Sequence, residues 1–120
     1  MLTLTSANSY YLCTKSVNMQ NSFDGLFNIV SSGMKRNPLS GEVFIFMNKP
    51  HNRIKFLHWE RGGFVIYYKR LEKGTFKQPL YENGVLSRPL KWTELVLMIE
   101  GISIDVSLKF KKRYEVAVNC

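Results

Sequence analysis

The chain contains few of the residue types that build catalytic, metal or disulfide sites. Its two cysteines, Cys13 and Cys120, lie near opposite ends of 120 residues and form neither a CxxC pair nor a disulfide framework. Only Asp24 and Asp105 are aspartates. Metal-dependent phosphoryl transfer needs several carboxylates that converge on paired ions. These shortages argue against an enzyme of that kind, and we expect no metal and no cofactor.

Long apolar runs are also missing. No stretch approaches the roughly 20 apolar residues of a membrane-spanning helix. Residues 1–16 have neither the basic segment nor the apolar run of a signal peptide. We therefore expect a cytoplasmic protein that does not associate with a membrane.

Basic residues dominate the charged positions. There are 17 lysines and arginines against 9 acidic residues, which gives a net charge of +8. Such a surplus predicts attraction to polyanions, with nucleic acid first and an acidic protein or membrane surface second. The alternative is that the charge serves solubility alone.

Periodic patterns predict a single α+β domain. Apolar residues at helical spacing predict helices over 21–37 and 91–102, the first with Phe23, Leu26, Phe27 and Val30 on one face. Runs of β-forming residues predict strands at 10–17, 42–48, 53–60 and 63–70. Residues 75–90 look irregular, with room for short edge strands around Asn83 and Gly84. The expected architecture is an antiparallel β-meander of three to five strands packed with two helices.

Residues 53–70 predict a hairpin whose register brings basic residues together. A two-residue turn at Arg61-Gly62 suits a tight hairpin. In that register Arg53 lies opposite Arg70, and Lys55 lies opposite Tyr68, on one face of the sheet. Like charges placed opposite each other weaken a sheet, so this pairing suggests that an anion normally lies between them.

The hairpin therefore supplies the candidate site for nucleic acid or another anion. The candidate residues are Arg53, Lys55, Tyr68, Lys69 and Arg70. Guanidinium groups fork onto phosphate oxygens, and a tyrosine donates a hydrogen bond or stacks on a base. The alternative is an internal network in which Asp24, Glu42 or Glu72 neutralises the arginines.

The remaining polar residues give little support for a catalytic role. His51 falls in a turn and His58 in a strand, and neither has a convincing cysteine or aspartate partner. We expect His58 to be partly buried, with its hydrogen bonds satisfied. Asp24 fits the positive end of a helix better than a metal site. Ser40-Gly41 is typical of a turn. We therefore predict that the protein is not an enzyme.

Three segments resemble, in order and spacing, the small TnpB-type accessory protein of the insertion-sequence-66 family of bacterial transposons. They are SVNMQNSFDGLFNIV (16–30), SGEVFIFMNKPHNRIKFLHWERGGFVIYYKRLEKGTF (40–76) and WTELVLMIEGISI (92–104). The most specific positions are Ser40-Gly41, Phe44, Phe46, Arg53, Lys55, Trp59, Gly63, Lys69 to Glu72, Gly74 and Phe76. The resemblance suggests an accessory domain over 1–104, followed by a basic extension over 105–120, either a strand or a loose tail.

The resemblance implies an accessory role in transposition beside a large transposase that carries the catalytic acids. The family usually has Thr-Asp-Met-Arg-Lys where this chain has residues 17–21, VNMQN, so an acid and two bases are gone. His58 stands where the family commonly has tryptophan. Two functions stay open: binding of DNA at transposon ends, or binding of the transposase with little DNA contact. Trp59 and Trp92 are candidate anchors for such a protein interface.

Overall fold

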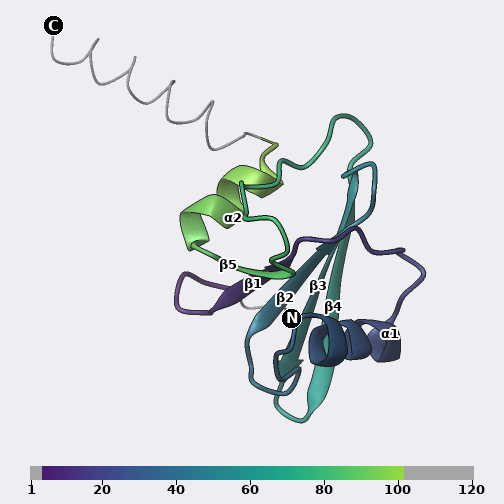
Figure 1. The fold of residues 1–120 in the computed structure, drawn as a ribbon, viewed down its shortest axis with the longest axis vertical. Helices are drawn as coiled ribbons and strands as arrows, with labels where there is room; N and C mark the ends of the chain where they lie inside the picture. The colour runs from purple at the N-terminus through teal and green to yellow at the C-terminus, as the bar shows by residue number, and fades with distance from the viewer. Residues whose placement is uncertain (1–3, 102–120) are drawn as a thin grey trace, which may run out of the picture.

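A computed structural model describes residues 4–101 and shows one five-stranded sheet with strand order β4-β3-β2-β1-β5 (Figure 1). The strands are β1 (Tyr10–Cys13), β2 (Val43–Met47), β3 (Arg53–Glu60), β4 (Gly63–Arg70) and β5 (Ser87–Leu90). The helices are α1 (Phe23–Asn28), its π-helical continuation η1 (Ile29–Gly33) and α2 (Trp92–Ile99). The α+β architecture is therefore confirmed.

Strands β2, β3 and β4 form the predicted antiparallel meander. The predicted register is confirmed, because Arg53 pairs with Arg70 and Lys55 pairs with Tyr68. The turn between β3 and β4 has positive φ at both central residues, 47° at Arg61 and 82° at Gly62. Two such residues match the right-handed twist of the flanking strands, which fixes the two-residue connection.

The first strand makes the sheet mixed rather than a pure meander. β1 pairs in parallel with β2 and antiparallel with β5. A parallel pair needs a long crossover, and residues 14–42 provide it by carrying α1 and η1 across one face. β1 is also shorter than the predicted strand at 10–17. The edge strand in the irregular region is 87–90, whereas Asn83 and Gly84 form a turn.

The sheet separates two apolar cores. One core, on the α1 side, includes Leu26, Val30, Phe44, Phe46 and Leu57. The other, on the α2 side, includes Ile45, Ile54, Phe56, Leu95 and Met98. Every residue of β2 is buried because this strand contributes to both cores. The expected burial of Leu26, Phe44, Phe46 and Phe56 is confirmed.

The first helix differs from the prediction in its shape and its ends. Its α-helical part stops at Asn28, and a π-helical turn continues to Gly33. Phe23 is 44% exposed because the stripe that packs on the sheet begins a turn later, at Leu26. Lys35 has a φ of 57° and ends the helical path, so it is not part of a last helical turn.

The second helix is shorter than the predicted range of 91–102. Lys91 precedes it, Leu95 and Met98 are buried, and Ile99 is half-buried. Ile102 and the predicted basic extension over 105–120 lie outside the described residues.

Candidate anion-binding face

Two arginines meet at the end of the β3–β4 hairpin that is distant from its turn. Arg53 Nη1 donates to the Tyr68 hydroxyl at 3.2 Å. Arg70 donates from Nε and Nη2 to Glu72 Oε1 at 3.0 and 2.7 Å. These four residues line a cavity of about 370 Å³, which we call the arginine hollow. The hairpin therefore builds a recess with two guanidinium groups and one phenol.

The charges of the two arginines are balanced differently. The Arg70–Glu72 pair is exposed, at 58% and 79% for the two side chains. Hydrogen bonding to Glu72 raises the pKa of Arg70. Exposed ion pairs of this kind contribute little to stability, so a competing anion can displace Glu72 easily. Within residues 4–101, Arg53 forms no ion pair with a carboxylate.

Another of the proposed neutralising residues is engaged elsewhere. Glu42 accepts two hydrogen bonds from Arg36, at 2.8 and 3.1 Å. These bonds lower the pKa of the Glu42 carboxyl and raise the pKa of Arg36. The guanidinium of Arg36 also stacks over the ring of Tyr11, 3.7 Å from its centroid. Internal neutralisation thus applies to Arg70, through Glu72, and not to Arg53.

Lys55 has a different environment from the one that its place in the hairpin suggested. The residue is only 7% exposed. Its Nζ donates to the backbone carbonyls of Met19 and Asn21, both at 2.7 Å. The same ammonium lies 4.8 Å from the centroid of the Tyr68 ring. Lys55 therefore holds the 14–22 loop on the sheet and supports Tyr68, instead of facing a ligand.

The other predicted site and interface residues are dispersed. Lys69 pairs with Ile54, so it points to the opposite face of the sheet from Arg53 and Arg70. Trp59 is half-buried against Phe64, with ring centroids 4.9 Å apart. Trp92 is 37% exposed and belongs to α2, on the other side of the sheet. The two tryptophans do not form one surface.

Residues near Asn48 complete the site and were missed by the sequence reasoning. Asn48 Oδ1 accepts from the backbone N–H groups of Asn52 and Arg53, both at 3.0 Å. It thereby fixes the backbone from which Arg53 projects. A second cavity of about 420 Å³, the asparagine hollow, includes Asn18, Asn48, Lys49 and Arg53 in its lining. The available signal was the Asn48-Lys49-Pro50 turn chemistry between two strands.

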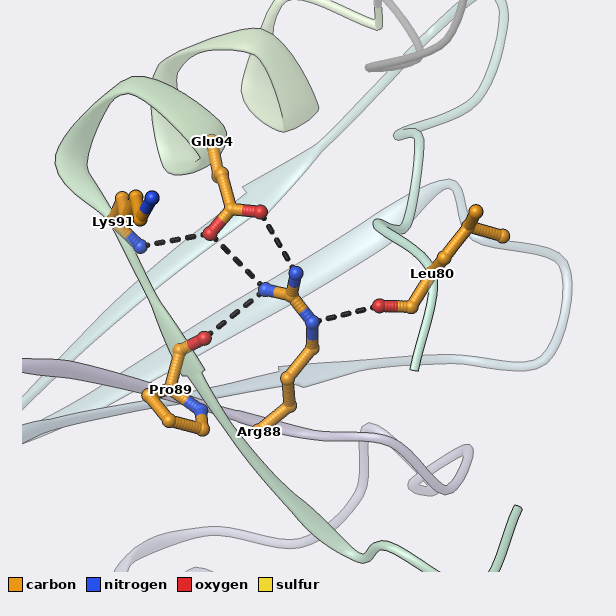
Figure 2. A network of polar contacts seen from close by, with 5 residues as sticks. All are labelled: Leu80, Arg88, Pro89, Lys91 and Glu94. Atoms are coloured by element: carbon orange, nitrogen blue, oxygen red, sulfur yellow. Dashed lines mark hydrogen bonds and ion pairs between the residues drawn. The ribbon is translucent and has the colours of Figure 1, made fainter. Parts of the chain in front are cut away.

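A separate polar network joins β5 to α2 (Figure 2). Arg88 forms a forked pair with the Glu94 carboxylate, at 2.8 and 3.1 Å, and also donates to the carbonyls of Leu80 and Pro89. Glu94 Oε1 accepts from the Lys91 backbone N–H at 3.0 Å. These hydrogen bonds, led by those from Arg88, lower the pKa of Glu94. Both charges are engaged within the fold, so we assign this network a structural role.

The described residues do not assemble an obvious catalytic centre. Residues 4–101 contain no group of three or more His, Cys, Asp or Glu side chains that could hold a metal. His58 is buried, but the prediction that its hydrogen bonds are satisfied is wrong, because its Nδ1 has no hydrogen-bond partner in this part of the chain. Its Nε2 lies 4.0 Å from Glu60 Oε2. None of the helices in the described range is long and apolar enough to span a membrane.

The fold and the site define a small basic α+β protein with a recess on one sheet face that is lined by two arginines. The family model described as "IS66 Orf2 like protein" matches residues 8–108. The chain belongs to the IS66 Orf2-like family, which is an accessory family associated with insertion-sequence transposition and is not a known catalytic family.

Two relatives come from Sinorhizobium fredii (strain NBRC 101917 / NGR234). The chain is 28% identical over 91 residues to "Uncharacterized protein y4jC", covering 76% of each chain. It is 27% identical over 92 residues to "Uncharacterized protein y4hO", covering 77% of this chain and 78% of the relative. No solved structure matches the chain.

Proposed function

We propose that this chain is a non-catalytic accessory protein that binds DNA at transposon ends and assists the separately encoded large transposase. The arginine hollow is the proposed contact. The observation that carries the proposal is Arg53, whose guanidinium has no carboxylate partner in the described residues and is held beside Arg70 by the hairpin register.

Phosphate fits the chemistry of the arginine hollow. Arginine presents a planar fork of N–H donors that matches phosphate oxygens, and two guanidinium groups at one site attract the negatively charged phosphodiesters of a DNA backbone. Tyr68 is 47% exposed and adds a hydroxyl donor or a stacking surface. Release of Glu72 from Arg70 needs little free energy because that pair is open to water.

A second candidate function is direct binding of the transposase. Trp92 and Val96 are 37% and 38% exposed and stand one helical turn apart on α2, so they form an apolar strip on the face opposite the arginine hollow. Aromatic residues often anchor protein interfaces. Salt separates the two functions, because binding to phosphates weakens steeply as salt rises and binding to an apolar strip does not.

The test removes both arginine charges with Arg53→Gln and Arg70→Gln in one variant. Fluorescence anisotropy with duplex DNA from the element ends, over a range of salt, is the measurement. DNA affinity should fall, and the slope of log affinity against log salt should shrink by roughly two units, near 0.9 for each lost contact. Thermal stability should hold or rise, because the like-charge pair is relieved.

The matched control is Lys35→Gln with Arg61→Gln, which removes the same charge at exposed positions that do not line the hollow. An equal loss of affinity in this control would reduce the proposal to non-specific attraction. Loss of stability in the Arg53/Arg70 variant with unchanged DNA affinity would make the arginines structural. Repeating the measurement with purified transposase shows whether the natural anion is an acidic protein surface instead.

A further inference from the structure

Three cavities on the α1 side of the sheet are joined by residues that they share. The arginine hollow and the asparagine hollow share Arg53. The asparagine hollow in turn shares Ser16, Val17 and Asn18 with a third cavity of about 440 Å³, which we call the inner pocket. The three cavities are therefore neighbours, and we call the series the track; it runs from the end of β4 to residues of the π-helical turn.

Basic residues are spaced along the whole of this track. Arg70 and Arg53 line the first cavity, Lys49 lines the second and Lys15 lines the third. Glu72, already paired with Arg70, is the one acidic residue that lines any of the three. The charge distribution along the track suits a chain of phosphates better than a single isolated anion.

The inner pocket changes the chemistry at the end of the track. Its walls include the apolar side chains of Val17, Ile29 and Leu86. The Asn28 side chain also lines the pocket and is exposed, so its amide is available to a ligand. A pocket that combines apolar side chains with amide and hydroxyl groups suits a nucleobase, because the ring packs on the apolar side chains and its edge pairs with the polar groups.

The wall of the inner pocket is itself unusual. Ile29, Ser32 and Gly33 belong to the π-helical turn η1, and all three line the pocket. Single π-helical turns are rare and occur frequently at functional sites. Gly33 faces β5, since a Cβ there would make a van der Waals contact with Leu86 Cδ2 at 3.4 Å.

We infer that this track binds single-stranded DNA, with phosphates along Arg70, Arg53, Lys49 and Lys15 and one unstacked base in the inner pocket. The inference rests on the proposed function and names its ligand. Bases in a duplex stay stacked and paired, so they cannot enter a recessed pocket, whereas the bases of a single strand are free to do so. The exposed Tyr68 ring beside Arg53 offers a stacking surface for a second base.

The experiment compares the full chain with a variant in which the inner pocket is filled, Ser32→Phe. Binding is measured by fluorescence anisotropy with a labelled 12-nucleotide single strand and with a duplex of the same sequence. Ser31→Phe is the matched control, since Ser31 is also exposed, is adjacent in the chain and does not line the pocket. Filling the pocket should weaken single-strand binding by about tenfold or more, since the base loses its contacts with the pocket walls and tenfold corresponds to only about 1.4 kcal/mol. Duplex binding and the Ser31→Phe control should be unchanged.

A second variant tests the same pocket in case Ser32→Phe fails to fold. Asn28→Ala removes only an exposed amide, so it should fold normally and reduce single-strand affinity without affecting the duplex. Replacing Lys15 and Lys49 with Gln should reduce the salt slope for the single strand by about 1.4 units, near 0.7 for each contact.

The outcomes separate this inference from the proposed function. Equal single-strand affinity in the Ser32→Phe, Asn28→Ala and unmodified proteins overturns the inner pocket as a base site. If duplex binding still falls in the Arg53/Arg70 variant, DNA binding through the arginine hollow stands without the pocket. If neither form of DNA binds the unmodified protein, both proposals fail.

Discussion

Replacement of Lys55 by methionine tests whether this lysine holds the fold or waits for an anion. Methionine keeps a long unbranched stem in a position that is only 7% exposed, and it removes all three N–H donors. The backbone carbonyls of Met19 and Asn21 then lose their partner in a half-buried region.

The expected loss of stability follows from these two contacts. Hydrogen bonds to a charged group contribute about 1.5–3 kcal/mol each. Methionine recovers part of this because no ammonium has to be desolvated. We therefore expect the free energy of unfolding to fall by about 2–4 kcal/mol. With an m-value of about 1–3 kcal/mol/M in urea, the midpoint should move down by about 0.7–4 M.

Urea unfolding followed by tryptophan fluorescence measures this shift, and amide hydrogen exchange locates it. Exchange should accelerate at residues 14–22, which the lysine holds on the sheet, before it accelerates in β3. The control is Lys49→Met, because Lys49 is exposed and its replacement should change stability by less than about 0.5 kcal/mol. Unchanged stability in Lys55→Met, together with weaker DNA binding, would refute this reasoning and restore Lys55 to the anion site.

Three further changes are informative. Glu94→Gln removes a carboxyl whose pKa is lowered by Arg88, so the stability that this carboxyl contributes is present above the ordinary glutamate pKa of about 4.3 and disappears as the pH falls through the lower folded value. The difference in unfolding free energy between the variant and the unmodified protein should therefore close in acid, and a difference that does not change with pH contradicts the pairing. Phe56→Ala should reduce stability by about 3–5 kcal/mol, since Phe56 is 2% exposed, and a urea-measured change below about 1 kcal/mol would place it outside the core. Gly62→Ala should lower the free energy of unfolding by about 1 kcal/mol. The cause is the φ of 82° alone, because a Cβ there meets nothing within 4 Å. Thermal melts of the control Gly63→Ala should show almost no change.

The hairpin was predictable because its signals are local. Alternating side chains and the Arg61-Gly62 turn specify strand length and register without reference to the rest of the chain. The place of β1 depends on distant pairing with residues 43–45 and 87–90, and a four-residue strand gives no sequence signal for a parallel partner. The π-helical turn was missed for a related reason, since helical periodicity does not distinguish one extra residue in a turn.

The candidate site was predictable only in part. Arg53, Tyr68 and Arg70 come together because the hairpin register alone places them. The environment of Lys55 depends on two backbone carbonyls of a loop that folds over the sheet, and carbonyls have no side-chain signature. The same loop creates the asparagine hollow, so the lining residues on 16–19 could not be paired with Arg53 from the sequence.

The interior position of β1, between β2 and β5, has a consequence for the order in which the protein assembles. β2, β3 and β4 are joined by short connections, so they can form during synthesis from local contacts. β5 pairs with β1 across nearly the whole described chain, and Leu86, next to β5, closes one side of the inner pocket. A nascent chain whose residues up to 70 have emerged from the ribosome can therefore already present Arg53 beside Arg70. The inner pocket exists only after β5 has docked, which makes the recess for phosphate an early product of folding and the recess for a base a late one.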